Sequence, residues 1–335
     1  MNNKKNIKND TLSKADGFLK NESKEWDKDN QAWWDWYVTL ADNSNSNSED
    51  TLLELPEPPK KKLPSKIELK QELARPYNIT NKDITTFQKN GFIKLKNVFT
   101  PSVIQALRYE ILSLLRKTFT NYYEIKKNRF LSLDMMWLKN NLIREFVLSS
   151  RIAKICADLL SVTKIRLYHD NALVKESGCG RTPWHYDDHH FPLATNDVIT
   201  AWIPAQAIPV EMGPLTFAKP LEVYKLVKDI KFNEFDTSYD KKINDIFKTK
   251  QVSIVEEPFE LGEVSFHHNL SFHTASENKT TQSRIVLANT YFADGARVVN
   301  NPTMISGDWK KFIPETNPGE IVSSNLNPIC WPVKN

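Results

Sequence analysis

Cysteine is scarce in this sequence, with three residues among 335 (Cys156, Cys179 and Cys330), an odd number without a short CxxC spacing. A disulfide framework and a cysteine-based zinc site are therefore not indicated, and a reducing compartment is expected. No stretch approaches the run of about 18 apolar residues that spans a bilayer. The basic N-terminus is not followed by the apolar segment of a signal peptide. We therefore expect a cytoplasmic protein without a membrane span.

An excess of one charge is also missing. The 45 lysines and arginines oppose 41 acidic residues, and the net charge of +4 is spread along the chain. This balance argues against a nucleic-acid partner. Hydrophobic residues make up 40% and charged residues 26% of the chain, which is ordinary for a folded globular protein. We expect a small-molecule ligand, and the sequence does not indicate the oligomeric state.

Residues 1–65 differ in composition from the rest and are expected to form a flexible polar extension. The extension contains an aromatic island at residues 33–37, which could be a short helix docked on the main domain or an exposed contact for a partner. A proline-rich connector follows at residues 56–64, where each proline fixes φ and disfavours helix before it. A single domain is expected over residues 66–335.

The expected domain opens with a short helix from about Asp83, a turn at Asn90-Gly91 and a strand. Apolar residues recur at helical spacing over 101–119, which predicts an amphipathic helix supporting a sheet. Short strands are then expected at 164–175, 197–203, 214–218, 252–257, 263–266, 271–276 and 284–293, with an insertion at 220–250 and a C-terminal tail from about residue 300. Many short strands with flanking helices predict a mainly β sandwich or barrel.

All seven histidines lie between residues 169 and 273, and one of them belongs to the triplet His185-Tyr186-Asp187. In an extended segment, residues two apart project from the same face, so the imidazole and the carboxylate can converge. A third ligand is expected from a distant strand, and His273 lies in such a strand. Two histidines and one carboxylate form the facial triad of non-haem Fe(II) oxygenases.

Arg284 follows His273 by eleven residues, inside the apolar run SRIVLANTYF. An unpaired guanidinium is costly in such a strand, so this side chain needs a carboxylate. The far carboxylate of a 2-oxoacid that chelates the metal is a suitable partner, because the planar guanidinium binds carboxylates bidentately.

Other residues in the same region have alternative interpretations. His189, His190, His267 and His268 could be ligands but are interpreted as ordinary surface or core residues, and Asp188 could replace Asp187 if the segment turns. Cys179, in a glycine-flanked loop, is interpreted as structural because no base is assigned near it. His169 and Asp170 are interpreted as part of a strand.

The sequence resembles the phytanoyl-CoA dioxygenase family of Fe(II)/2-oxoglutarate-dependent oxygenases over about residues 90–293. The residues that carry the resemblance are IRLYHDNALVKESGCGRTPWHYD, ITAWIPAQAIPVEMGPLTF and GEVSFHHNLSFHTASENKTTQSRIVLANTYF. It implies a double-stranded β-helix, a cupin-like jelly roll. It also implies iron ligation by His185, Asp187 and His273, binding of the 2-oxoglutarate C5 carboxylate by Arg284, and positions near the cosubstrate for Trp202 and Asn171.

The resemblance further implies Fe(II), 2-oxoglutarate and O2 as cofactor and cosubstrates. The expected reaction is oxidation of an unactivated C–H bond of a small metabolite by hydroxylation, desaturation or oxidative cyclisation, with succinate and CO2 as coproducts. The carboxylate at Asp187 disfavours halogenation. Residues 212–214 and 217–220 depart from the family pattern, and no glycine-rich phosphate loop supports an acyl-CoA substrate. The alternative is a non-catalytic jelly-roll module that recruits a partner through its N-terminal extension.

Overall fold

The structure is a computed structural model that describes residues 30–42, 63–119, 128–231, 233, 235–302 and 309–333. Most of the predicted flexible extension, including residues 56–62 of the proline-rich connector, lies outside the described residues. The aromatic island is described and forms a helix. None of the described helices is both long and apolar enough to cross a membrane.

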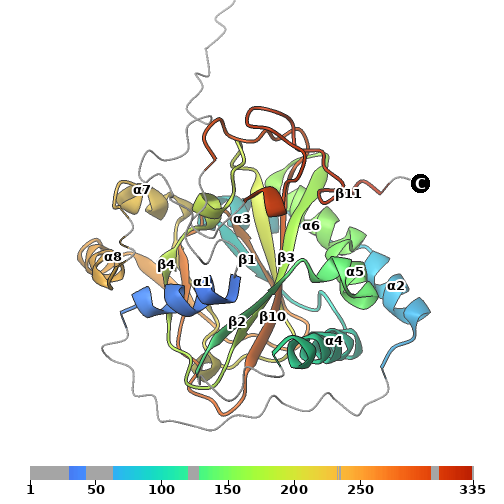
Figure 1. The fold of residues 1–335 in the computed structure, drawn as a ribbon, viewed down its shortest axis with the longest axis horizontal. Helices are drawn as coiled ribbons and strands as arrows, with labels where there is room; N and C mark the ends of the chain where they lie inside the picture. Colours follow the sequence, from blue (N-terminus) through green and yellow to red (C-terminus); the bar gives the residue numbers. More distant parts are fainter. Residues whose placement is uncertain are drawn as a thin grey trace, which may run out of the picture.

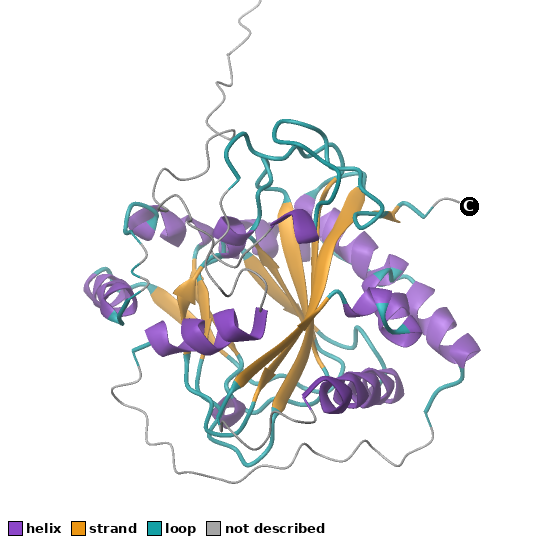
Figure 2. Ribbon diagram, in the orientation of Figure 1, coloured by secondary structure: helices purple, strands orange, loops and turns teal. Residues whose placement is uncertain are grey.

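Two antiparallel sheets form the centre of the molecule (Figures 1 and 2). The larger, seven-stranded sheet has the order β1-β8-β5-β10-β3-β11, with β2 also paired to β3, and the smaller one has the order β4-β9-β6-β7. The described strands are β1 (Phe92–Leu95), β2 (Phe130–Asp134), β3 (Ile165–Lys175), β4 (Thr182–His185), β5 (Val198–Pro204), β6 (Leu215–Lys219), β7 (Ser253–Glu256), β8 (Val264–His268), β9 (His273–Ala275), β10 (Arg284–Ala293) and β11 (Ile329–Trp331). This architecture confirms the predicted mainly β jelly roll.

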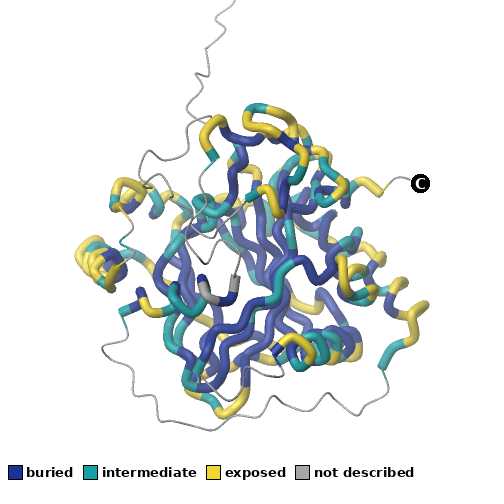
Figure 3. The backbone as a smooth tube through the Cα atoms, in the orientation of Figure 1, coloured by how far each residue is buried: buried dark blue, intermediate teal, exposed yellow. Residues whose placement is uncertain are grey.

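Helices cover one side of the larger sheet, at the right of Figure 2. They are α2 (Lys66–Ala74), α4 (Pro101–Phe119), α5 (Asn141–Val147) and α6 (Ser150–Leu160), while α3 (Asn81–Asn90) precedes β1. The predicted helix at 101–119 has the bounds of α4, whose apolar face is buried in the main core. Capping boxes at Ser65 and Thr80 satisfy free N–H groups at the starts of α2 and α3. The buried strands between these helices and the smaller sheet are the dark centre of Figure 3.

The chain between β6 and β7, expected as an insertion, forms a short helical segment (η6, Leu221–Val223), α7 (Tyr224–Val227) and α8 (Ser238–Thr249). Helix α8 packs its apolar face on the smaller sheet, where Ile243 and Phe247 join Trp184 and Phe272 in a second hydrophobic core. In the C-terminal tail, the 3-10 helix η7 (Trp309–Lys311) leads toward β11, which pairs with β3.

The aromatic island lies in α1 (Asn30–Tyr37), which a 3-10 turn (η2, Val38–Leu40) follows. This helix crosses in front of the sheets in Figure 1 and contacts β2. Trp33, Tyr37 and Leu40 are buried there. Of the two interpretations of the island, the structure has the docked helix.

Candidate metal and cosubstrate site

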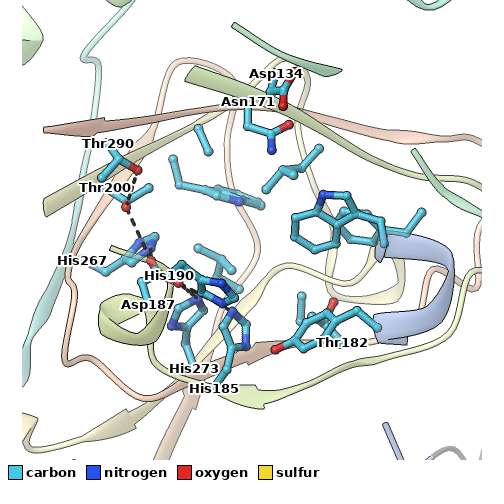
Figure 4. A pocket seen from close by; sticks show the side chains of 18 of the residues that line it. Asp134, Asn171, Thr182, His185, Asp187, His190, Thr200, His267, His273 and Thr290 are labelled. Atoms are coloured by element: carbon cyan, nitrogen blue, oxygen red, sulfur yellow. Dashed lines mark hydrogen bonds and ion pairs between the residues drawn. The ribbon is translucent and has the colours of Figure 1, made fainter. Parts of the chain in front are cut away.

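Three of the predicted site residues meet between the two sheets. His185 ends β4, and Asp187 begins the 3-10 helix η4 (Asp187–His190), while His273 begins β9. His185 and His273 are partners in the β4–β9 register, which brings their rings to a centroid distance of 4.2 Å. One ligand atom from each of the three residues lies within 4.8 Å of the others. Figure 4 shows the three side chains converging at one end of a cavity.

Backbone carbonyls fix the orientation of both histidine rings. The Nδ1 atom of His185 lies 2.8 Å from the carbonyl oxygen of Pro183, and that of His273 lies 3.0 Å from the carbonyl oxygen of Ser271. Nδ1 is then the protonated nitrogen, and the Nε2 lone pairs are free for a metal. Burial lowers the pKa of both imidazoles, and for His273 the nearby His185 lowers it further. Both rings are therefore neutral, as metal binding requires.

The two oxygens of Asp187 have different surroundings. Oδ1 lies 3.7 Å from Nε2 of His185 and 3.8 Å from Nε2 of His273. Oδ2 lies 3.3 Å from Nε2 of His267 and 3.5 Å from the hydroxyl of Thr200. Burial raises the pKa of Asp187, but the surrounding histidines, His273 first, outweigh it and hold this pKa below its ordinary value. The carboxylate is thus ionised, with one oxygen held and the other facing the two histidines.

Arg284 begins β10 and is 1% exposed. One terminal nitrogen donates to the carbonyl oxygen of Gly213 at 2.6 Å, whereas the buried Nε has no hydrogen-bond partner. The guanidinium lies 5.4 Å from the centre of the Trp202 ring. No carboxylate within the described part of the chain pairs with it. Burial lowers its pKa to about 10, so the group remains charged at neutral pH. A buried cation without a carboxylate requires an anionic ligand.

Gly213 allows the close approach that holds Arg284. Its φ is +72°, and a Cβ at this position would lie 2.1 Å from the carbonyl oxygen of Ser276. A residue with a Cβ would force the backbone at position 213 away from Ser276. The carbonyl at position 213, which accepts the hydrogen bond from Arg284, would move with it. The glycine within the divergent Met212-Gly213-Pro214 segment therefore has a direct structural role in the site.

One cavity connects the two parts of the site. Its described lining contains all six residues predicted for the site: Asn171, His185, Asp187, Trp202, His273 and Arg284. The amide oxygen of Asn171 accepts a hydrogen bond from the hydroxyl of Ser132 at 2.8 Å. In Figure 4, Asn171 lies across the cavity from His185 and His273. The structure thus brings the six predicted residues to one cavity, with Asn171 on the side away from the triad.

The other candidates from the sequence have structural partners. Asp188 accepts a hydrogen bond from the Asn269 side chain at 2.7 Å, and Asp170 accepts from the backbone N–H of Met136 at 2.9 Å. Cys179 is fully buried, and burial raises its pKa to about 11, so it is not a reactive thiolate. These observations agree with the structural interpretations of Asp170 and Cys179.

Three histidines that were given structural interpretations from the sequence line the cavity, namely His169, His190 and His267. His267 contacts Asp187 because the register of β5 and β8 places it opposite Thr200, which also contacts Asp187. The sequence contained a signal for His267, because Ser265 and His267 alternate with the apolar residues Val264 and Phe266. The structure shows that both polar residues are buried. Polar residues on the inner face of a strand indicate a cavity or a hydrogen-bonded network.

The donor set fits iron and 2-oxoglutarate. Two neutral imidazoles and one ionised carboxylate are the ligands of non-haem Fe(II) oxygenases. The unpaired guanidinium of Arg284 fits the distal carboxylate of a 2-oxoacid in the same cavity.

The solved structures with a similar fold include SnoK, SnoN and EctD. SnoK, described as a non-heme alpha ketoglutarate dependent carbocyclase from nogalamycin biosynthesis, has a TM-score of 0.61 at 20% identity and covers 76% of this chain and 99% of its own. The epimerase SnoN, crystallised with Fe3+, alpha ketoglutarate and nogalamycin RO, has a TM-score of 0.54 at 18% identity, covering 74% of this chain and 96% of SnoN. EctD from S. alaskensis with bound Fe has a TM-score of 0.58 at 15% identity and covers 74% of this chain and 89% of its own. At these identities the likeness supports the fold alone.

Comparison by sequence is more direct. The search of curated protein sequences returned no match to this chain. Residues 87–286, more than half of the chain, match the family described as phytanoyl-CoA dioxygenase (PhyH). This match agrees with the resemblance seen over residues 90–293, and it confirms the predicted enzyme class and its iron and 2-oxoglutarate. The chain therefore belongs to the phytanoyl-CoA dioxygenase family of Fe(II)/2-oxoglutarate-dependent oxygenases.

Proposed function

We propose that this protein oxidises an unactivated C–H bond of a small organic molecule, with His185, Asp187 and His273 as iron ligands and Arg284 as the partner of the 2-oxoglutarate C5 carboxylate. The observation that carries the proposal is the buried guanidinium of Arg284, which has no carboxylate partner in the described structure and faces the same cavity as the three ligands. Burying a charge in this way is costly unless a ligand pairs with it.

Each residue has a defined task in this proposal. His185, Asp187 and His273 would hold Fe(II), which would bind the cosubstrate and O2. Arg284 binds the far carboxylate, and the ring of Trp202 beside it excludes water from the ion pair. Bound iron with 2-oxoglutarate supplies the oxidising chemistry. For hydroxylation, one oxygen atom of O2 enters the product, the other enters succinate, and CO2 leaves.

The reaction outcome is chosen by how the substrate lies in the cavity. Among the fold relatives, one is described as a carbocyclase, one as an epimerase, and one was crystallised with 5-hydroxyectoine. Hydroxylation, desaturation and ring closure can all follow from removal of one substrate hydrogen. Our proposal is therefore oxidation at an unactivated C–H bond of a small molecule.

The first experiment is an anaerobic titration with Fe(II) and then 2-oxoglutarate, monitoring the weak visible charge-transfer band of the chelate. We expect the band in the wild-type protein. In Arg284→Ala, we expect the apparent Kd for 2-oxoglutarate to rise by about 30-fold or more, because a buried charge pair loses one partner.

A chemical control tests the assigned contact. 2-Oxobutyrate keeps the chelating group but lacks the distal carboxylate, so its affinity should change little in Arg284→Ala. Equal losses for both oxoacids would assign Arg284 to general stability. Absence of the band in wild-type protein with iron demonstrably bound would contradict the proposed function.

A further inference from the structure

Helix α1 lies outside the family-matched residues 87–286, yet it contributes to the wall of the cavity. Trp33, Trp34 and Tyr37 from this helix line the same cavity as the three iron ligands. In Figure 4, the blue helix borders the cavity on the side opposite Thr200 and Thr290. The N-terminal aromatic island is thus part of the site, although it ends fifty residues before the matched region in sequence.

Specific hydrogen bonds hold this segment at both ends. The side-chain amide of Gln31 donates to the carbonyl oxygen of Phe130 at 2.7 Å and accepts from the N–H of Ser132 at 3.0 Å, so it pairs with the free edge of β2. At the other end, the N–H of Asp42 donates to the buried carboxylate of Asp240 in α8 at 2.9 Å. The docked position of α1 is therefore defined by the fold.

The aromatic rings of α1 form an ordered wall. Trp34 stacks on Phe130 with a centroid distance of 4.6 Å, and Trp33 stacks on Tyr37 at the same distance. Trp33 and His190 form a T-shaped contact with a centroid distance of 5.7 Å. Rings that support one another in this way lose little conformational entropy when a ligand packs on them. The wall is preorganised for apolar contact.

The remaining lining on this side is uncharged or already paired. Phe191 and Phe312 add apolar surface, and Asp134 forms an ion pair with Lys311. Among the described lining residues, Arg284 is the single lysine or arginine, and the proposed function assigns it to the cosubstrate. The described lining therefore offers no further lysine or arginine to a phosphate or carboxylate of the substrate.

Two polar groups are available to orient a ligand. His169 lines the cavity, and its Nδ1 atom is buried without a hydrogen-bond partner. Burial lowers its pKa to about 4, so the ring is neutral at physiological pH. The amide of Asn171 lines the same side. A hydroxyl or carbonyl group satisfies such partners without a net charge.

The volume of the cavity limits the size of the ligand. It measures about 140 Å³, which corresponds to room for on the order of ten water molecules. 2-Oxoglutarate takes part of this space. The part of the substrate that lies beside the cosubstrate is therefore small.

We propose that α1 completes the substrate chamber, and that the chamber takes a small uncharged molecule with a ring that packs against Trp33 and Trp34 and a polar group directed to His169 and Asn171. This inference rests on the proposed function, because the substrate must lie next to the iron. It assigns substrate recognition to a segment outside the matched family region.

The test uses the full chain loaded anaerobically with Fe(II) and 2-oxoglutarate. Three probes of one shape are compared, namely cyclohexylmethanol, cyclohexanecarboxylate and cyclohexylmethylammonium. Broadening of their proton NMR signals by the paramagnetic iron reports binding near the metal. We expect the alcohol to bind most tightly. Tighter binding of either charged probe, or no broadening of any probe, would overturn the substrate class.

Two tryptophans of the same helix provide matched variants. Trp34 lines the cavity, whereas Trp36 is partly buried in the same aromatic cluster and does not line it. In Trp34→Ala, we expect binding of the alcohol to weaken by about tenfold or more. Trp36→Ala should retain wild-type affinity, and Trp34→Phe should recover part of the loss. Equal losses in both alanine variants would reduce α1 to a structural role.

The charge-transfer band separates this inference from the proposed function. A normal band in wild-type protein that binds none of the three probes would contradict the assigned chamber and leave the iron and cosubstrate site intact. Absence of the band with iron bound would contradict the proposed function itself, and with it the chamber.

Discussion

One stretch of sequence supplies the residues that form the inner end of the cavity, namely His185, Asp187, Thr200, Trp202, His267, His273 and Arg284. The outer wall instead combines Trp33, Trp34 and Tyr37 with Phe130 and Phe312. At the inner end, strand pairing and backbone carbonyls hold His185 and His273, and the side chains of His267 and Thr200 hold Asp187. At the outer wall, rings from distant segments pack on one another. Chemistry and recognition are thus supported by different forces, and a change in one region should leave the other intact.

The largest expected effect is at the inner end. His273→Ala removes one proposed iron ligand, and we expect the affinity for Fe(II) to fall by more than the ~100-fold that substitutions outside the ligand sphere reach. Anaerobic Fe(II) titration measures it. His268→Ala is the matched control, because His268 is a nearby histidine outside the cavity lining. Similar losses in both variants would show that the triad is not the metal site.

A smaller effect is expected at His267, which contacts Asp187 without belonging to the triad. His267→Ala should lower Fe(II) affinity by about 10- to 100-fold, because the ligating carboxylate loses the group that orients it. His267→Gln, which can still donate a hydrogen bond, should recover part of this affinity. An unchanged affinity in the alanine variant would remove His267 from the site.

Gly213→Ala tests the link between backbone and cosubstrate. Forcing a Cβ against the carbonyl of Ser276 should cost about 1–3 kcal/mol of stability and weaken 2-oxoglutarate binding more than Fe(II) binding. Denaturant unfolding and the charge-transfer titration measure the two effects. Gly295→Ala is the control, since Gly295 also has a positive φ but no atom within 4 Å of an added Cβ. Equal behaviour of the two variants would attribute the effect to φ alone.

The smallest effect is expected at the anchor of the outer wall. Gln31→Ala removes two hydrogen bonds to the edge of β2 and should destabilise the docked helix by about 1–2 kcal/mol. Hydrogen exchange of residues 30–42 should then accelerate, while the charge-transfer band should persist. Gln88→Ala, an exposed glutamine of α3, is the control. Loss of the band in Gln31→Ala would contradict the separation of the two regions.

Much of the sheet was predictable because its long strands carry clear patterns. The strands expected at 164–175 and 284–293 are β3 and β10, and the helix expected at 101–119 is α4. The short strands β2, β4 and β11 have three to five residues and were not predicted. Length alone does not explain the difference, because β6, β7, β8 and β9 are equally short and were expected. The three missed strands are stabilised by pairing with β3 or β9, which local sequence does not specify. The domain boundary at residues 65–66 stays a prediction.

The site also divides into residues that the sequence identified and contacts that only strand pairing created. The spacing of His185 and Asp187 and the position of Arg284 in an apolar strand identified the inner end before the fold was known. The contact between His267 and Asp187 required the register of β5 against β8. The neighbouring His268 has the parity of Val264 and Phe266, so the two histidines lie on opposite faces of β8.

By itself, the sequence determined the metal-binding chemistry, because local backbone geometry places residues two apart on one face and a buried arginine demands an anion. Tertiary structure alone decided which wall the substrate meets. Trp33 and Trp34 reach the cavity through apolar packing and through hydrogen bonds to β2 and α8. Apolar burial is non-directional, so no spacing within the chain specifies where such a helix docks.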